Sequence, residues 1–136
     1  MKNLLLVLTI LLFPFEVSSD FKSDIKINSN SIEFLKGSNK INFLDNVEIN
    51  SEYVNIKANS ATYDQNKDVI SFSGTPTLIK SKKNEGLFDG RAEKILFFND
   101  EEIHLIGNAS MTYENVSVSS NVIIFNPQNG KIASGW

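Results

Sequence analysis

The chain has 136 residues, of which 41% are apolar and 21% are charged, and its formal net charge at pH 7 is -3. This length fits one domain, or one domain behind a targeting segment. The sequence contains no Cys, which excludes a disulfide scaffold, a thiolate zinc site and a cysteine nucleophile. A single His leaves little room for a catalytic triad, and a net negative chain lacks the basic field that nucleic-acid binding needs.

The N-terminal segment is typical of a secretory signal peptide. One lysine precedes an apolar run at 4–15, and small residues follow this run. Val17 and Ser19 would stand at the -3 and -1 positions of a cleavage directly after Ser19. Crossing a bilayer takes roughly 20 apolar residues, so this shorter run favours cleavage over a membrane anchor. We therefore expect a signal peptide at 1–19, a domain at 20–136, and export to a bacterial envelope, where disulfides are permitted but not required.

Apolar and polar residues alternate through most of the chain from Ile25 onward, and almost no stretch shows a helical period. Such alternation is typical of strands that are buried on one face. Turn-forming residues separate the alternating runs, and Gly and Asn among them tolerate the positive φ of tight turns. The clearest alternating runs are 25–27, 40–43, 54–58, 103–105 and 116–118, and the turns are 36–39, 64–68, 99–101 and 126–130. The sequence therefore predicts an all-β, antiparallel domain without a helix.

A repeat underlies this alternation. An apolar residue is followed about thirteen positions later by a Gly or Asp that opens a short signature, so each unit predicts a hairpin-like module packed against its neighbours. The modules begin at Ile32, Ala61, Ile95 and Val122, and the signatures begin at Asp45, Gly74, Gly107 and Gly135. Glycine inside a strand usually marks a bulge or a bend. We therefore expect sheets that curl, as in a jelly roll or an open twisted barrel.

Because every second side chain of a strand points the same way, the alternation also predicts an inward-facing apolar set. The candidates are Ile25, Ile27, Ile41, Phe43, Val54, Ile56, Ile79, Ile95, Phe97, Ile103, Leu105, Met111, Val122 and Ile124. These residues could line a groove for a lipid, or they could form the closed, dry core of an ordinary β-sandwich. The residues alone leave both interpretations open.

Six short segments, in their order and spacing, resemble the OstA-like family. The segments are 25–29, 43–47, 55–59, 73–76, 89–92 and 105–109. The resemblance covers the chain from about Asp24 to Gly135 and implies a twisted β-jelly roll whose two sheets splay into an apolar groove for the acyl chains of lipopolysaccharide. The chain departs from the family pattern at Asp45, where the family favours Gly, and it stops at Trp136, earlier than we would expect of family members. This second departure affects the C-terminal edge of the domain, where the resemblance implies docking to the next domain.

The same resemblance implies a carrier in the periplasm of a Gram-negative bacterium, which forms part of a bridge from the inner to the outer membrane. Its partners would be the lipid A acyl chains of lipopolysaccharide, inner-membrane LptC-like and outer-membrane LptD-like OstA domains, and further copies of itself joined head to tail. The fourteen candidates named above would then be lipid-binding residues. The terminal runs at 25–28 and 131–134 are candidate edge strands for docking, because an open sheet edge is a template for another strand.

Two alternatives stand beside this interpretation. One is a membrane-anchored LptC-like component that has the same domain and retains its N-terminal segment. The other is a structural β-solenoid or adhesin fragment with a closed core. Solenoids repeat at uniform spacing, whereas these modules begin at 32, 61, 95 and 122, which are 29, 34 and 27 residues apart, so the spacing weakens the solenoid interpretation.

The remaining signals predict surface features. Lys80, Lys82 and Lys83 form a basic cluster that we interpret as a solvated turn, and His104 should lie on the face opposite the lining. The acidic residues 100–102 lack the alternating ligand pattern of a calcium loop, so we expect them to be a solvated hairpin tip. Since no nucleophile motif, phosphate loop or paired-carboxylate motif is present, we expect neither enzymatic activity nor a cofactor or metal.

Overall fold

The computed structural model describes residues 5–9, 15–17, 25–82 and 87–135, with side chains from Ile25 onward. Regular structure in these ranges is entirely β, as the alternation predicts. The strands are β1 (Leu5–Thr9), β2 (Phe15–Val17), β3 (Ile25–Asn28), β4 (Ser31–Leu35), β5 (Lys40–Asn50), β6 (Val54–Asp64), β7 (Val69–Ser81), β8 (Phe88–Phe98), β9 (Ile103–Tyr113), β10 (Val116–Asn126) and β11 (Lys131–Ser134). No helix that could span a membrane occurs in the part of the chain that the structure describes.

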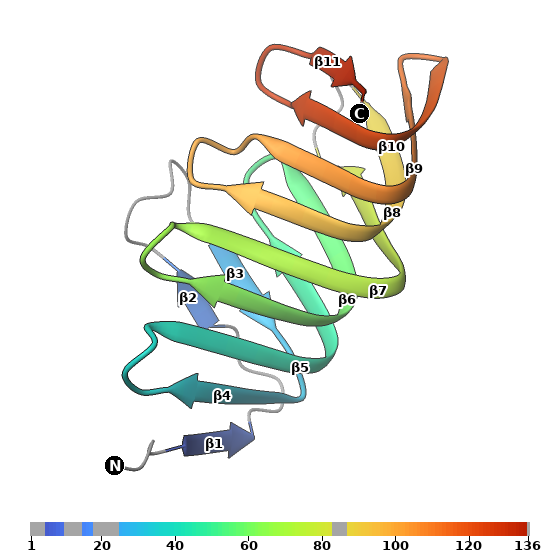
Figure 1. Cartoon of the computed structure of the whole chain (residues 1–136). Coiled ribbons are helices and arrows are strands. Elements are labelled where there is room, and N and C mark those ends of the chain that lie inside the picture. The colour runs from blue at the N-terminus through green and yellow to red at the C-terminus, as the bar shows by residue number, and fades with distance from the viewer. Residues whose placement is uncertain (1–4, 10–14, 18–24, 83–86, 136) are drawn as a thin grey trace.

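All the strands belong to one antiparallel sheet. Its order is β1-β4-β5-β6-β7-β8-β9-β10-β11, with β3 paired to β5 and β2 paired to β3. From β4 to β11 each strand therefore lies beside its successor in the sequence (Figure 1). The predicted turns at 36–39, 64–68, 99–101 and 126–130 all fall where consecutive strands connect, although Asp64 and Asn126 are the last residues of β6 and β10. The hairpin-by-hairpin organisation predicted from the repeat is thus confirmed.

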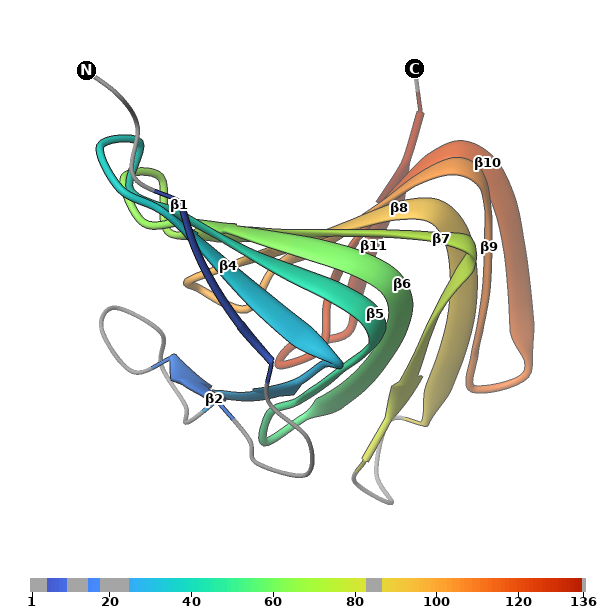
Figure 2. The same cartoon turned by 90° about the horizontal axis from the view of Figure 1, so that it is seen from below.

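The long strands β5 to β10 bend midway, so one sheet forms two layers (Figure 2). The ladders shift register near the bends, between Leu44 and Val47 in β5 and between Ser73 and Thr77 in β7. Asp45 and Gly107, which open two of the predicted signatures, have left-handed backbone here, with φ of 66° and 88°. The expectation that these residues mark bends is therefore confirmed, because a β-bulge bends the strand that carries it.

The bends divide each of the strands β5 to β10 into two halves. We call the halves that adjoin the turns at 36–39, 65–68, 99–101 and 127–130 the first layer, and the opposite halves the second layer. The first layer also contains β4 and β11, and the second contains β3. A continuous cluster of buried apolar side chains fills the space between the layers. The four largest fully buried side chains among the described residues come from the first layer, and they are Phe43, Phe72, Phe97 and Phe125.

The strands β1 and β2 cover the N-terminal edges of the two layers. β1 pairs with the whole of β4, from Ser31 to Leu35, and β2 pairs with residues 25–27 of β3. Both segments lie within the stretch for which the sequence predicts a signal peptide. The predicted cleavage position after Ser19 lies outside the described residues. If that cleavage occurs, β4 and β3 become the N-terminal edges of the domain.

Candidate functional site: an apolar interior between two layers

Thirteen of the fourteen predicted inward-facing residues are buried, but one of them, Val122, is 7% exposed and lies outside the interior cluster. The other twelve lie between the layers and are at most 4% exposed. They come from both layers: Phe43 and Phe97 lie in the first, and Ile56 and Ile79 in the second. Alternation has therefore placed these apolar faces correctly.

The expected inward orientation is wrong for Ile124 and also for Val122, which pairs with Ile106 and has the same parity along β10 as Ile124. Between Ser120 and Val122 the pairing of β10 with β9 shifts register, so the alternation slips by one residue. Ile123 lies opposite the buried Leu105 and is itself fully buried, whereas Ile124 pairs with His104 on the outer face and is half-buried. A period of two that is extended across a β-bulge therefore assigns the residues after the bulge to the wrong face.

Sequence reasoning also missed several interior residues. Phe72 and Ile70 in β7, Ile49 in β5 and Phe125 in β10 are at most 1% exposed. The run 69–73 alternates as clearly as the runs that were used, so period two could have found Phe72 and Ile70. Phe125 could not be found in this way, because it follows the register slip.

The acidic hairpin tip differs from the expectation at one residue. Asp100 is exposed as predicted, but Glu101 is fully buried, so the prediction of a wholly solvated tip is wrong. Glu101 has a left-handed φ of 68°, and its N–H donates to the Phe98 carbonyl at 2.8 Å, which turns the chain back toward the protein. Within the described ranges no group of three His, Asp or Glu residues could hold a metal ion.

His104 lies on the outer face, as expected from its place between two inward residues. The distance between its Nε2 and the Glu102 Oε1 is 3.0 Å, and its ring centroid is 4.6 Å from that of Phe98. Lys80 and Lys82 are exposed, as expected, but Lys80 belongs to the strand β7 and not to a turn, and Lys83 lies outside the described residues.

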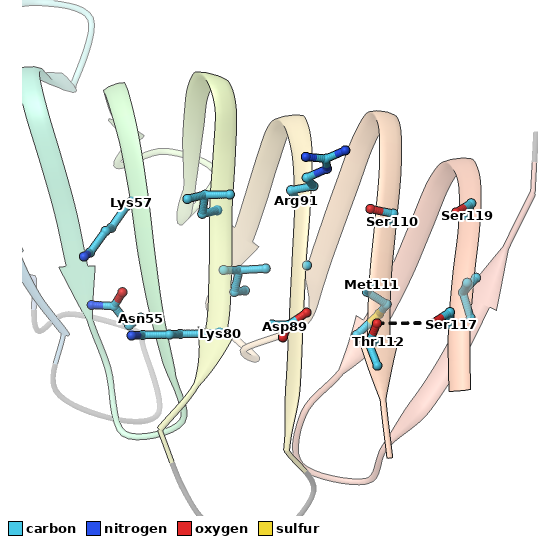
Figure 3. A pocket seen from close by; sticks show the side chains of 14 residues that line it. Asn55, Lys57, Lys80, Asp89, Arg91, Ser110, Met111, Thr112, Ser117 and Ser119 are labelled. Atoms are coloured by element: carbon cyan, nitrogen blue, oxygen red, sulfur yellow. Dashed lines mark hydrogen bonds between the residues drawn. The ribbon is translucent and has the colours of Figure 1, made fainter. Parts of the chain in front are cut away.

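A hollow of about 590 Å³ lies on the outer face of the second layer (Figure 3). Two cross-strand rows line it, Lys57, Leu78, Arg91, Ser110 and Ser119 in one, and Asn55, Lys80, Asp89, Thr112 and Ser117 in the other. Most of these side chains carry a charge or a hydroxyl, and the hydroxyls of Thr112 and Ser117 are 3.3 Å apart. Ile79, Gly90, Met111 and Val118 also line the hollow, so its lining mixes charged and hydroxyl groups with apolar ones, whereas the interior cluster consists of apolar side chains. The apolar interior is therefore the candidate lipid site.

The interior becomes uncovered at its β10 end. Phe88, Tyr113 and Val116 form one cross-strand row on the inward face of β8, β9 and β10. Phe88 is 6% exposed, Tyr113 is half-buried and Val116 is 59% exposed. In the next row Met111 is buried, but its neighbour Val118 is only half-buried. The layers also diverge toward β9 and β10 in Figure 2, so the apolar inward face continues to the molecular surface there.

The backbone of β10 is uncovered at the same end. β11 pairs only with residues 123–126 of β10, in the first layer. No described strand pairs with the outer side of residues 116–120, in the second layer. This half of β10 is an open edge that could accept another strand.

Comparison with known proteins agrees with this architecture. The family model described as "LptA/(LptD N-terminal domain) LPS transport protein" matches residues 26–131. Among solved structures, the crystal structure of LptH from Pseudomonas aeruginosa superposes with a TM-score of 0.74 at 19% sequence identity, covering 86% of this chain and 85% of that one. Its title describes LptH as the LptA homologous periplasmic component of the conserved lipopolysaccharide transport device. No curated protein sequence matches significantly. The ordered segments that resemble the OstA-like family are thus confirmed, and the chain belongs to the LptA and LptD N-terminal domain family of lipopolysaccharide transport proteins.

Proposed function

We propose that the protein is a periplasmic carrier of lipopolysaccharide, which holds the acyl chains of its cargo between the two layers and forms part of a bridge from the inner to the outer membrane. The observation that carries this proposal is the continuous apolar interior, bounded by both layers and uncovered at β10. Membership of a lipopolysaccharide transport family supports it, as does the fold shared with LptH.

The chemistry of the interior suits acyl chains. Burial of a methylene is worth about 0.8 kcal/mol, so a chain of about twelve carbons needs an apolar lining that stabilises it by on the order of 10 kcal/mol. The interior side chains are aliphatic or aromatic, and Thr77, a buried polar residue of the second layer, donates its hydroxyl to the Glu93 carbonyl at 3.3 Å. An acyl chain would therefore meet few polar groups that it leaves without a partner.

The interior side chains are closely packed, so cargo must part the layers. The two layers are halves of the same strands and are joined along the bends, while side chains fill the space between them. Apolar contact is non-directional, so acyl methylenes can replace side-chain contacts without loss of a specific bond. We therefore infer that the layers separate around the bends as lipid enters.

Photo-crosslinking tests where the lipid lies. We expect a photoreactive residue at Phe43, Ile56 or Phe97 to form adducts with lipopolysaccharide that copurifies with the exported protein, because these side chains face the interior. The matched control is Leu78, which belongs to the same sheet but faces outward and is 45% exposed. Absence of an adduct at all three interior positions, or equal labelling at Leu78, would contradict a lipid site between the layers.

Docking to neighbouring domains would use the open strand edges. We propose that residues 116–120 of β10 and the strand β11 pair with the N-terminal edges β3 and β4 of the next OstA-like domain, first layer to first layer and second to second. The apolar interior would then continue from one domain to the next. The inner-membrane LptC-like and outer-membrane LptD-like domains would join the two ends in the same manner.

The open edge of β10 allows a test that spares the fold. Glu114 and Asn115 both have positive φ, which makes a two-residue hairpin. Along β10, successive residues direct their N–H groups alternately toward β9 and toward the unpaired edge. The N–H groups of Ser117 and Ser119 should therefore point to the unpaired edge. We expect Ser117→Pro and Ser119→Pro to abolish concentration-dependent assembly in sedimentation velocity, while Ser117→Ala assembles normally. A wild-type protein that stays monomeric at high micromolar concentration and binds neither partner domain would refute docking.

The N-terminus decides between the carrier and its anchored relative. We expect the mass of the protein isolated from the periplasm to correspond to a chain that begins at Asp20. A chain that begins at Met1 and remains in the membrane fraction would instead support the LptC-like alternative.

A further inference from the structure

Three aromatic side chains meet at the uncovered end of the interior. Phe88 and Tyr113 come from the second layer, and Phe125 comes from the first. The ring centroids of Phe88 and Phe125 are 4.5 Å apart in an edge-to-face arrangement, and those of Tyr113 and Phe125 are 5.5 Å apart. Both geometries lie in the range that aromatic pairs prefer. These rings therefore join the two layers across the interior, far from the bends that connect the layers covalently.

The turn after β10 supports Tyr113 from its other side. A Cβ atom added at Gly130 would lie 2.6 Å from the Tyr113 hydroxyl oxygen and 3.3 Å from Cζ. Gly130 also has a φ of 74°, and its N–H donates to the Asn126 carbonyl at 2.8 Å. The Tyr113 ring thus lies close to Phe125 while its hydroxyl lies against the backbone of Gly130. A side chain at position 130 would displace it.

The position of this cluster is the second observation. Val116 is exposed and Val118 is half-buried, and both continue the apolar inward face of the second layer outward from Tyr113. An acyl chain that arrives along this exposed face meets Tyr113 first, and then Phe88 and Phe125, which belong to the interior cluster. Tyr113 itself is half-buried, so its ring can turn toward solvent without unfolding the core.

We propose that Phe88, Tyr113 and Phe125 form an aromatic gate that controls the uptake and release of acyl chains at the β10 end, with Gly130 as the positioning residue for Tyr113. This inference rests on the proposed carrier function and adds to it the residues that set the rates of lipid exchange. When the gate opens, the acyl chain takes the place of the Tyr113 ring against Phe125, and apolar contact is exchanged for apolar contact.

Stopped-flow fluorescence with BODIPY-labelled lipopolysaccharide tests the gate. We expect Tyr113→Ala to accelerate both uptake and release severalfold, because the layers are no longer joined at this end. Gly130→Ala should act in the same direction by displacing the ring. Tyr113→Phe retains the ring and should exchange lipid at the wild-type rate. The double variant with Tyr113→Phe and Gly130→Ala lacks the hydroxyl oxygen that lies nearest to the added Cβ. We therefore expect it to exchange lipid at the wild-type rate.

Gly37→Ala is the matched control for backbone strain. Gly37 also has a positive φ, 99°, but a Cβ there meets nothing within 4 Å, so this variant should exchange lipid at the wild-type rate. Unchanged rates in both Tyr113→Ala and Gly130→Ala, or an equal acceleration in Gly37→Ala, would overturn the gate while leaving the carrier function intact. A double variant as fast as Gly130→Ala alone would overturn the role of the hydroxyl contact. A wild-type protein that binds no lipopolysaccharide would overturn the carrier and the gate together.

Discussion

Left-handed backbone at the described residues other than glycine is carried mainly by Asn and Asp. Among the described residues with positive φ are Asn39, Asp45, Asn46 and Asn108. Their short side chains can hydrogen-bond locally, which lowers the cost of this conformation relative to other non-glycine residues. Asp45 is the position at which the OstA-like family favours Gly, and with a φ of 66° it adopts the backbone that Gly would supply. The departure at this residue therefore preserves the bend.

Tyr113 provides a prediction at the residue scale. Desolvation, and then the charge of Glu114 and a hydrogen bond to it, raise the pKa of Tyr113 above its ordinary value of 10.0. The folded protein thus favours the neutral phenol, so this contribution to stability is complete below the unfolded pKa and is lost as pH rises through the folded one. We expect urea unfolding from pH about 9 to about 11 to show a steeper loss of stability in the wild type than in Tyr113→Phe. Parallel losses would contradict the raised pKa.

The strand with a midway bend is the structural element that makes the site. A straight strand of this length would present its inward side chains to one flat face, whereas the bent strand faces itself across the interior. In β9 the bend contains Gly107 and Asn108, both with positive φ. The Asn108 Nδ2 donates to the Glu93 Oε2 at 2.7 Å, which ties this bend to the neighbouring strand β8. Local backbone chemistry thus decides where the two layers meet.

The bend in β9 supplies the prediction at this scale. A Cβ at Gly107 would lie 2.6 Å from the Glu93 Oε1, whereas a Cβ at Gly37 meets nothing within 4 Å. Left-handed backbone costs a residue with a side chain roughly 1–2 kcal/mol, so we expect Gly37→Ala to lose about that much. Gly107→Ala should lose roughly 0.5–1.5 kcal/mol more, the worth of one hydrogen bond, because Glu93 must shift and its bond with Asn108 is disturbed. Urea denaturation measures both, and equal losses would show that the Glu93 contact does not matter.

Over the whole molecule, stability should fall from the centre of the sheet toward the β10 end. The central strands are paired on both sides and cover fully buried side chains such as Phe72 and Ile95. The second-layer half of β10 lacks a described partner on its outer side and ends in the exposed Val116. The end at which we place lipid exchange is therefore also the end with the least packing.

Hydrogen exchange tests this gradient. We expect the amides of β7 and β8 to exchange slowest and those at 116–120 to exchange faster, because strands with few buried contacts open locally at lower free energy. Exchange followed by mass spectrometry resolves these segments. Equal protection of 116–120 and of the central strands would contradict an open β10 end.

The alternation in the sequence determined the all-β class and the inward faces of most strands, and the Asn, Asp and Gly residues determined the turns and bends at Asp45 and Gly107. These features are local, because strand alternation and left-handed backbone depend on neighbouring residues only. The tertiary structure alone decided that Ile123 rather than Ile124 faces inward, that Glu101 is buried, and that Phe88 and Phe125 meet. Each of these depends on how β10 slips against β9 or how the two layers cross, and such long-range geometry leaves no period in the sequence.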